Sequence, residues 1–358
     1  MPADRGPGGH HEWALLQPGG TFAVGAGLLF GASAPLARLL LLQTSPWLLA
    51  GLLYLGSGLG LSAYRWWRHQ AAPRVSPSAW GTVVVATFAG GVCAPVLLMV
   101  GLRGMAATHA SLLLNLEGVF TVLLARFAFG ERVGWRLGLG MAAILSAAVL
   151  LTTGSHVSVV LLWPVVAVAS ACAAWALDNN LTRRVALIDA TWLAALKGVT
   201  AGIANTSIAL ALGATWPPIS VVVGALGLGS VAYGLSLVLF IRGLRDLGAA
   251  RTSAYFSVAP FFGAALAVPL LGEAPHQRLL LAGVLMAVGV WLQLSERHSH
   301  IHVHEAMGHE HAHTHDLHHL HEHAGLVSTG EHNHWHHHEG QTHTHPHAPD
   351  IHHRHGHP

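Results

Sequence analysis

Apolar runs of about twenty residues, separated by short polar seams, make up most of the chain between residues 22 and 295. A helix needs about 20 apolar residues to cross the hydrocarbon core of a bilayer. The seams are rich in prolines, glycines and charges, which end helices. The pattern predicts ten transmembrane helices at residues 22–42, 46–64, 79–101, 105–125, 134–153, 157–179, 190–212, 219–241, 249–271 and 278–295.

The arginines predict the orientation of these spans. If the N-terminus is cytoplasmic, the outer loops receive only Arg103 and Arg278. The inner loops receive the larger set, which is Arg65, Arg68, Arg74, Arg126, Arg132, Arg136, Arg183, Arg184, Arg242, Arg245 and Arg251. Cytoplasmic loops carry the excess of positive residues in membrane proteins. Both termini are therefore predicted to be cytoplasmic.

The chain also matches itself without gaps when it is shifted so that Gly101 falls on Gly243, a displacement called here the repeat offset. Chance similarity between two helices rich in leucine and alanine would hardly supply the paired residues, which are Gly101 with Gly243, Arg103 with Arg245, Gly130 with Gly272, and Glu131 with Glu273. A unit of five helices is odd, so its second copy must enter the membrane upside down. Inverted repeats are typical of secondary transporters, whose binding site lies near the midplane between the halves.

With these paired Gly-Leu-Arg and Gly-Glu elements, the chain resembles the EamA branch of the drug/metabolite transporter superfamily. The resemblance covers about residues 22–295. The chain is expected to comprise a cytoplasmic segment at 1–21, five-helix repeats at 22–153 and 157–295, and a tail at 296–358. The resemblance implies a proton-coupled or exchange-type carrier of small metabolites, amino acids or drugs in the bacterial inner membrane. The segment from Trp175 to Arg183 resembles a subgroup with a His-rich tail. One departure is Gly118, preceded by Glu117, where the second repeat has Pro260.

Composition agrees with a membrane body. Of the 358 residues, 52% are hydrophobic and only 9% are charged, against roughly 25% charged in soluble proteins. The basic residues stand singly, which argues against nucleic acid as a partner. The two cysteines, Cys93 and Cys172, lie inside apolar runs and predict no disulfide. No catalytic constellation or sizeable soluble domain is evident, so we expect no enzyme.

Glu117 is the sharpest candidate for a coupling site. It lies about halfway along the fourth predicted span, where a charge costs roughly 3 kcal/mol or more. A proton or cation site is one interpretation, and a hydrogen-bonded packing acid is the other. Thr121 follows Glu117 by one helical turn, whereas Asn115 belongs to a second polar stripe of the same helix. We expect Glu117 and Thr121 to face the pathway.

Four further residues are candidates for the transport site. Asp178 and Asn179 close the sixth span, where they either coordinate a substrate or end a helix. Lys197 lies about two turns into the seventh span, and it either snorkels to the interface or pairs with Asp178 or Glu117. Tyr255 in the ninth span is an ordinary polar candidate.

The C-terminal tail holds 24 of the 30 histidines. Its alternating candidates for metal ligands are His298, His300, His302, His304, His309, His311, His313, His315, His332, His334 and His336. Residues two apart share a side only in an extended chain, and imidazole suits Zn, Ni and Co. The tail has too few apolar residues to bury a core, so it is predicted to be disordered. It is interpreted as a metal buffer or sensor, or as a low-complexity tail that binds metal incidentally.

Two functions follow, in order of preference. The first is a secondary carrier, most simply an efflux carrier, of small metabolites, amino acids or drugs that requires no cofactor and has a metal-responsive tail. The alternative is a divalent-metal transporter for Ni, Co or Zn whose tail delivers or senses the ion. The membrane body is poor in paired metal ligands, which places metals second. The expected partners are a small-molecule substrate, the bilayer, divalent metal ions and, as an open alternative, a second copy of the chain.

Overall fold

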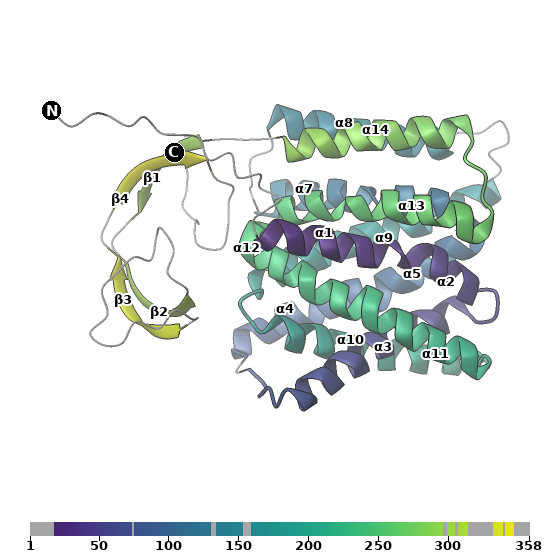
Figure 1. Cartoon of the computed structure of the whole chain (residues 1–358), viewed down its shortest axis with the longest axis horizontal. Helices are drawn as coiled ribbons and strands as arrows, with labels where there is room; N and C mark the ends of the chain where they lie inside the picture. Colours follow the sequence, from purple (N-terminus) through teal and green to yellow (C-terminus); the bar gives the residue numbers. More distant parts are fainter. Residues whose placement is uncertain are drawn as a thin grey trace. The chain divides into compact units, whose positions relative to one another are not determined.

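A computed structural model describes residues 18–73, 75–129, 134–152, 159–295, 299–304, 307–313, 332–338 and 341–346. Between residues 18 and 295 its regular elements are all helical (Figure 1). They are α1 (Pro18–Gly31), α2 (Ser33–Leu40), α3 (Pro46–Trp67), α4 (Pro77–Ala86), the π-helical segment η2 (Thr87–Cys93), α5 (Ala94–Gly104), α6 (Ala107–Leu113), α7 (Leu116–Phe129), α8 (Trp135–Thr152), α9 (Val159–Arg184), α10 (Ala190–Ala211), α11 (Ile219–Leu228), the π-helical segment η3 (Gly229–Leu235), α12 (Ser236–Phe256), α13 (Val258–Leu271) and α14 (Gln277–Leu294). The predicted all-α body is confirmed.

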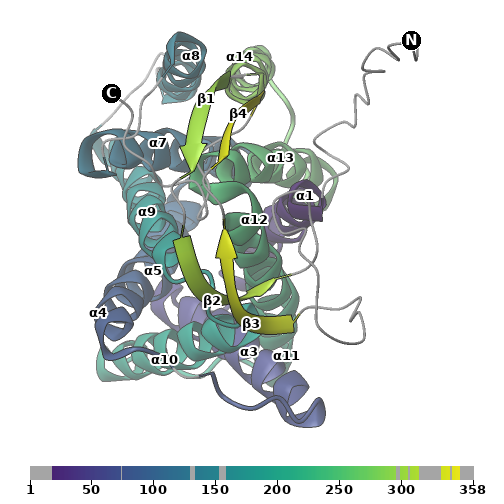
Figure 2. The same ribbon diagram turned by 90° about the vertical axis from the view of Figure 1, so that its left-hand side faces the viewer.

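The predicted spans fall on apolar stretches that consist of one or more helical elements. Among the described residues, eight stretches are long and apolar enough to cross a membrane, namely Pro18–Leu40, Pro46–Trp67, Pro77–Gly104, Ala107–Ala128, Leu162–Arg184, Ala190–Ala211, Ile219–Leu247 and Arg251–Leu271. The fifth and tenth predicted spans fall on two shorter apolar stretches, Trp135–Leu151 and Gln277–Gln293. These belong to α8 and α14, which lie side by side in both views (Figures 1 and 2).

One seam differs from the prediction. The sequence pattern ends the eighth span at residue 241 and begins the ninth at residue 249, but α12 is continuous from Ser236 to Phe256. Of the seven connecting residues, two are arginine and two are leucine, which are good helix formers, two are glycine and one is aspartate, and none is proline. The helix ladder therefore continues through this connection.

Several elements recur at the repeat offset. The repeat offset pairs the first and last residues of α8 with the first and last residues of α14. It pairs the ends of η2 with the ends of η3 in the same way. The break between α6 and α7 includes Asn115, and the offset pairs Asn115 with Ser257, where α12 gives way to α13. The same distortions thus occur at the same places in both halves of the sequence.

Helices α3 and α10 cross unusually closely because glycines line their contact. A Cβ added to Gly58 would lie 2.3 Å from the backbone nitrogen of Val199, and one added to Gly198 would lie 2.5 Å from that of Gly58. Both distances are below any real contact, so the two backbones touch. Small residues allow such approaches between membrane helices.

An ion pair joins α3 to the start of α10. Asp189 caps α10 by accepting a hydrogen bond from the Trp192 N–H at 2.7 Å, and it also pairs with Arg65. Partial burial raises the pKa of Asp189, but hydrogen bonds from Thr191 and Trp192 and the Arg65 guanidinium outweigh it and hold that pKa below its ordinary value.

This pair makes one contribution to stability depend on pH. Because the folded-state pKa of Asp189 is lowered, the contribution is present above the ordinary value, about pH 4, and is lost as pH falls through the lowered pKa. The carboxylate is 44% exposed, so we expect Asp189→Asn to cost at most about 1 kcal/mol at pH 7. Thermal unfolding in detergent should show a difference from wild type at pH 7 that shrinks near pH 3. A difference that grows on acidification would contradict this assignment.

The tail forms a separate unit, Arg297–Ala348. Its described residues lie in β1 (Ser299–His304), β2 (Met307–His313), β3 (His332–His338) and β4 (Gln341–Pro346). β1 pairs with β4 and β2 with β3, both antiparallel. These four segments are extended, as the two-residue period of the His-x-His pattern suits, and disorder of the tail stays a prediction.

Candidate functional site

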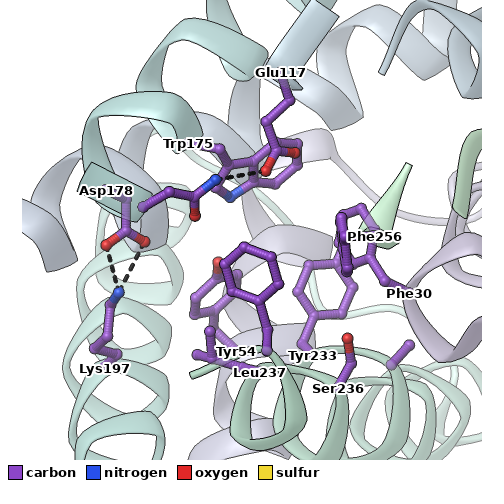
Figure 3. A pocket seen from close by; sticks show the side chains of 13 residues that line it. Phe30, Tyr54, Glu117, Trp175, Asp178, Lys197, Tyr233, Ser236, Leu237 and Phe256 are labelled. Atoms are coloured by element: carbon purple, nitrogen blue, oxygen red, sulfur yellow. Dashed lines mark hydrogen bonds and ion pairs between the residues drawn. The ribbon is translucent and has the colours of Figure 1, made fainter. Parts of the chain in front are cut away.

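A cavity of about 60 Å³ lies inside the helical body, with room for several water molecules (Figure 3). Its walls come from helices of both sequence halves. The lining residues are Phe30, Tyr54, Glu117, Trp175, Asp178, Asn179, Lys197, Ala232, Tyr233, Ser236, Leu237, Phe240 and Phe256. Charged side chains and aromatic rings therefore share one cavity.

Glu117 is in the first turn of α7, directly after the break that separates α6 from α7. It is 8% exposed, and its Oε1 accepts a hydrogen bond from Asn179 Nδ2 at 2.7 Å. Glu117 also lines a second, smaller cavity of about 10 Å³ with Gly118, Ser257 and Pro260. Its carboxyl group therefore borders both spaces.

Asp178 and Lys197 form a buried ion pair at another side of the cavity (Figure 3). The Lys197 ammonium lies 2.5 Å from Asp178 Oδ1 and 2.8 Å from Oδ2. Thr182 donates to Asp178 Oδ1 at 2.7 Å and accepts from Lys197 at 3.1 Å. A buried charge is tolerated when it is paired and hydrogen-bonded, as both of these charges are.

The π-helical segment η2 supplies a backbone acceptor to the cavity wall. The Gly90 carbonyl accepts hydrogen bonds from the Tyr54 hydroxyl at 2.7 Å and from the Trp175 indole N–H at 3.0 Å. A π-segment disturbs the regular hydrogen-bond ladder and is frequent at functional sites. A Cβ at Gly90 would lie 1.9 Å from Asp178 Oδ2, so this approach of the carboxylate requires glycine.

Aromatic rings form much of the remaining wall. Phe30 contacts Trp175, Tyr233 and Phe256 at ring-centroid distances of 5.5, 5.5 and 5.4 Å. Tyr54 lies 5.4 Å from Tyr233. Offset and edge-to-face rings at such distances attract one another, so the rings hold a defined shape around the polar groups.

The structure brings four of the predicted residues together. Glu117, Asp178, Asn179 and Lys197 all line the cavity. Of the two pairings that the sequence left open for Lys197, the structure shows the one with Asp178.

Three predicted residues lie outside both cavities. Asn115 is buried and donates to the Leu112 carbonyl, and Thr121 is buried in α7. Tyr255 is partly buried, whereas its neighbour Phe256 lines both cavities. The expected partnership of Glu117 with Thr121 on the pathway side is therefore not seen.

Sequence reasoning missed the aromatic lining. The lining rings are Phe30, Tyr54, Trp175, Tyr233, Phe240 and Phe256. Each is a single aromatic residue within an apolar helix, where lipid-facing and core positions look alike in the sequence. The repeat offset pairs Tyr233 with Gly91, but the π-helical segments that contain both residues appear only in the structure.

Among the described residues, no group of three or more His, Cys, Asp and Glu side chains is placed to hold a metal ion. His298 and His315 lie outside the described residues, and the side chains of the other tail histidines are not described. The backbone register does place His309 opposite His336 and His311 opposite His334.

Comparison with known proteins supports a transporter. The sequence profile of the EamA-like transporter family matches residues 17–153 and 162–295. A curated relative from Methanothermobacter thermautotrophicus, described as an uncharacterized transporter, is 27% identical and matches 75% of this chain and 83% of its own length. A solved crystal structure, described only as that of a protein, has a TM-score of 0.63 at 20% identity and covers 76% of this chain and 95% of that one. The last likeness concerns the fold alone.

Proposed function

The chain belongs to the EamA-like transporter family, and on that premise we propose that it is a secondary active carrier of small organic molecules. It is a multi-pass membrane protein of the drug/metabolite transporter type and a transporter rather than an enzyme. The proposal adds proton coupling, the bacterial inner membrane as the location, and efflux as the direction. The observation that carries it is the cavity, which combines Glu117 with the Asp178–Lys197 pair between helices of both halves.

We further propose that the body has ten spans in two inverted five-helix halves. The bounds of α8 correspond to those of α14, and the bounds of η2 to those of η3, at the same repeat offset. This correspondence supports the arrangement. The cavity lies among helices of both halves, as the binding site of an inverted-repeat carrier does. The uneven distribution of arginines supports cytoplasmic termini.

The coupling role is proposed for Glu117. Its carboxyl group borders the cavity and accepts a hydrogen bond from the neutral amide of Asn179. Such a group can take up a proton on one side and release it on the other as the two halves rock around a fixed site. Asp178 is less suited to this role, because Lys197 balances its charge.

The cavity favours an organic substrate over a metal ion. Its described lining contains no histidine or cysteine, and aromatic and aliphatic side chains predominate. Transition metals and zinc prefer imidazole and thiolate ligands. We therefore keep metal binding for the tail and do not propose metals as the cargo.

Deleting residues 298–358 should remove most Zn or Ni binding and leave a folded carrier. The family match ends at residue 295, and the tail strands belong to a separate unit. Calorimetric titration of purified full-length and truncated protein with Zn²⁺ or Ni²⁺ measures the change. Size-exclusion chromatography controls for folding. Unchanged metal binding by the truncated body would contradict this assignment and favour a metal carrier.

Transport by the full-length protein in proteoliposomes tests the main proposal. A panel of cationic, zwitterionic and anionic aromatic compounds is offered with and without a pH gradient, and protein-free liposomes are the control. We expect at least one compound to accumulate only when protein and gradient are both present. If no organic compound moves faster than in protein-free liposomes, the proposal is wrong.

A further inference from the structure

The charges that line the cavity do not balance. Three charged residues line it, and they are Glu117, Asp178 and Lys197. Lys197 donates to both oxygens of Asp178, so these two charges neutralise each other. Glu117 is left with the neutral amide of Asn179 as its hydrogen-bond partner among the described residues. When Glu117 is ionised, the cavity therefore carries one uncompensated negative charge.

The described residues provide no further cation at this place. Lys197 is the only lysine in the chain, and no arginine or histidine lines the cavity in the described part of the chain. An ionised carboxylate in such surroundings is costly unless a cation or a proton compensates it. The compensating group must then come from outside the chain.

The walls suit an organic cation better than a hydrated metal ion. Six of the thirteen lining residues are aromatic, and their rings pack at centroid distances of 4.9 to 5.5 Å. The electron-rich faces of Trp, Tyr and Phe attract ammonium groups. Aromatic rings also pack against the apolar carbon atoms of an organic amine. A metal ion has no such apolar part.

The same arrangement disfavours anions. A substrate carboxylate in the cavity would meet Glu117 or Asp178, and it could reach the Lys197 ammonium only by displacing Asp178. Like charges at close range exclude wrong ligands. The carboxylate of a zwitterion is repelled by Glu117 and Asp178 in the same way, although its ammonium group is not.

We propose that the cavity selects small organic ammonium ions, which bind at the Glu117 carboxylate in competition with a proton. This substrate class rests on the proposed function and refines it. Protonated Glu117 loses its proton to the solution when the ammonium ion binds, and the carboxylate and the ammonium then balance each other. No bond within the amine changes. One proton leaves for each cation that enters, which is the stoichiometry of an exchanger.

The other titratable groups around Glu117 do not provide this exchange. They are Asp178 and Cys172 from α9, Lys197 from α10, Tyr54 from α3 and Tyr233 from η3. Asp178 and Lys197 are paired, and the Tyr54 hydroxyl donates to Gly90. Cys172 and Tyr233 are neutral in their ordinary state. Glu117 is thus the group whose proton a cation displaces.

Three compounds with one aromatic ring test the charge preference. Phenethylamine is a cation at neutral pH, phenylalanine a zwitterion, and phenylacetate an anion. Calorimetry with the full-length protein in detergent should show phenethylamine binding at least about tenfold more tightly than phenylalanine, and no binding of phenylacetate. Repeating the titration in buffers of different ionisation enthalpy should show about one proton released per phenethylamine bound. Equal affinity for all three compounds, or binding without proton release, would overturn the proposal.

Matched variants locate the site. Glu117→Gln should weaken phenethylamine binding at least about tenfold and abolish proton release. Tyr233→Leu removes a lining ring and should weaken binding about fivefold, whereas Tyr233→Phe keeps the ring and should lose less affinity than Tyr233→Leu. Trp163→Leu, at a position that is 65% exposed and away from the cavity lining, is the control for loss of an aromatic residue. Wild-type affinity in both Glu117→Gln and Tyr233→Leu would place the binding elsewhere.

Transport separates this inference from the function on which it rests. Proteoliposomes that accumulate phenylalanine or phenylacetate but exclude phenethylamine would retain the carrier and refute the cation preference. Movement of none of the three compounds, nor of any other organic compound in the panel, would refute the carrier itself. Movement of phenethylamine driven by an opposing proton gradient supports both.

Discussion

Replacing Glu117 with glutamine should abolish gradient-driven transport while leaving a folded protein in the membrane. Glutamine keeps the shape of the side chain and can still hydrogen-bond to Asn179, which now contacts Glu117 at 2.7 Å. It removes a group that costs roughly 3 kcal/mol when charged in a membrane helix, so insertion should not suffer. Net transport should fall at least about tenfold, because the variant cannot take up and release a proton.

The measurement is accumulation of phenethylamine, or of whichever panel compound the wild type moves, in proteoliposomes with and without a pH gradient. Glu117→Asp is the matched control, since it keeps a titratable carboxyl group and should retain part of the driven transport. Exchange of labelled for unlabelled compound needs no net proton movement and should survive in the glutamine variant to a greater extent. Undiminished pH-driven transport by Glu117→Gln would show that this acid has only a structural role.

Breaking the Asp178–Lys197 pair should destabilise the protein more than any other single substitution in the cavity. The side chain of Lys197 is 2% exposed and that of Asp178 is 9% exposed. Removing one partner leaves the other as an uncompensated buried charge, at a cost of about 3–5 kcal/mol. We therefore expect Asp178→Asn and Lys197→Met each to lower the thermal unfolding temperature in detergent markedly.

The double variant distinguishes the charge effect from a loss of packing. With Asp178→Asn and Lys197→Met combined, no buried charge is left unpaired, so the stability should recover most of the loss. Thr191→Val, which removes a hydrogen bond to the partly exposed Asp189 carboxylate, should have a much smaller effect and serves as a control. Losses that simply add in the double variant would contradict the ion-pair account.

The sequence was informative where membrane physics restricts the choice of residues. An apolar run long enough to cross a bilayer has few alternatives to a helix, so the predicted spans fall on helical segments of the structure. Charged residues inside such a run are costly. For this reason Glu117, Asp178 and Lys197 could be selected as site candidates before their positions in space were known.

The sequence was less informative where several arrangements cost about the same. An aromatic residue in an apolar helix can face lipid, core or cavity with little energetic difference, so Phe30 and Tyr233 could not be recognised as lining residues. The connection through α12 and the strands of the tail depend on local preferences of a few tenths of a kcal/mol per residue. Small preferences of this kind are poor guides to where an element ends.

The single lysine gives this protein a built-in chemical reporter. An amine-reactive reagent has one side-chain target in the whole chain, and that target is held in the cavity wall by Asp178. Acylation of Lys197 requires the ammonium to leave its carboxylate, lose a proton and meet the reagent in water. The rate of labelling therefore measures how often the cavity opens, and an increase in mass at one residue records the alternation of the carrier without any engineered label.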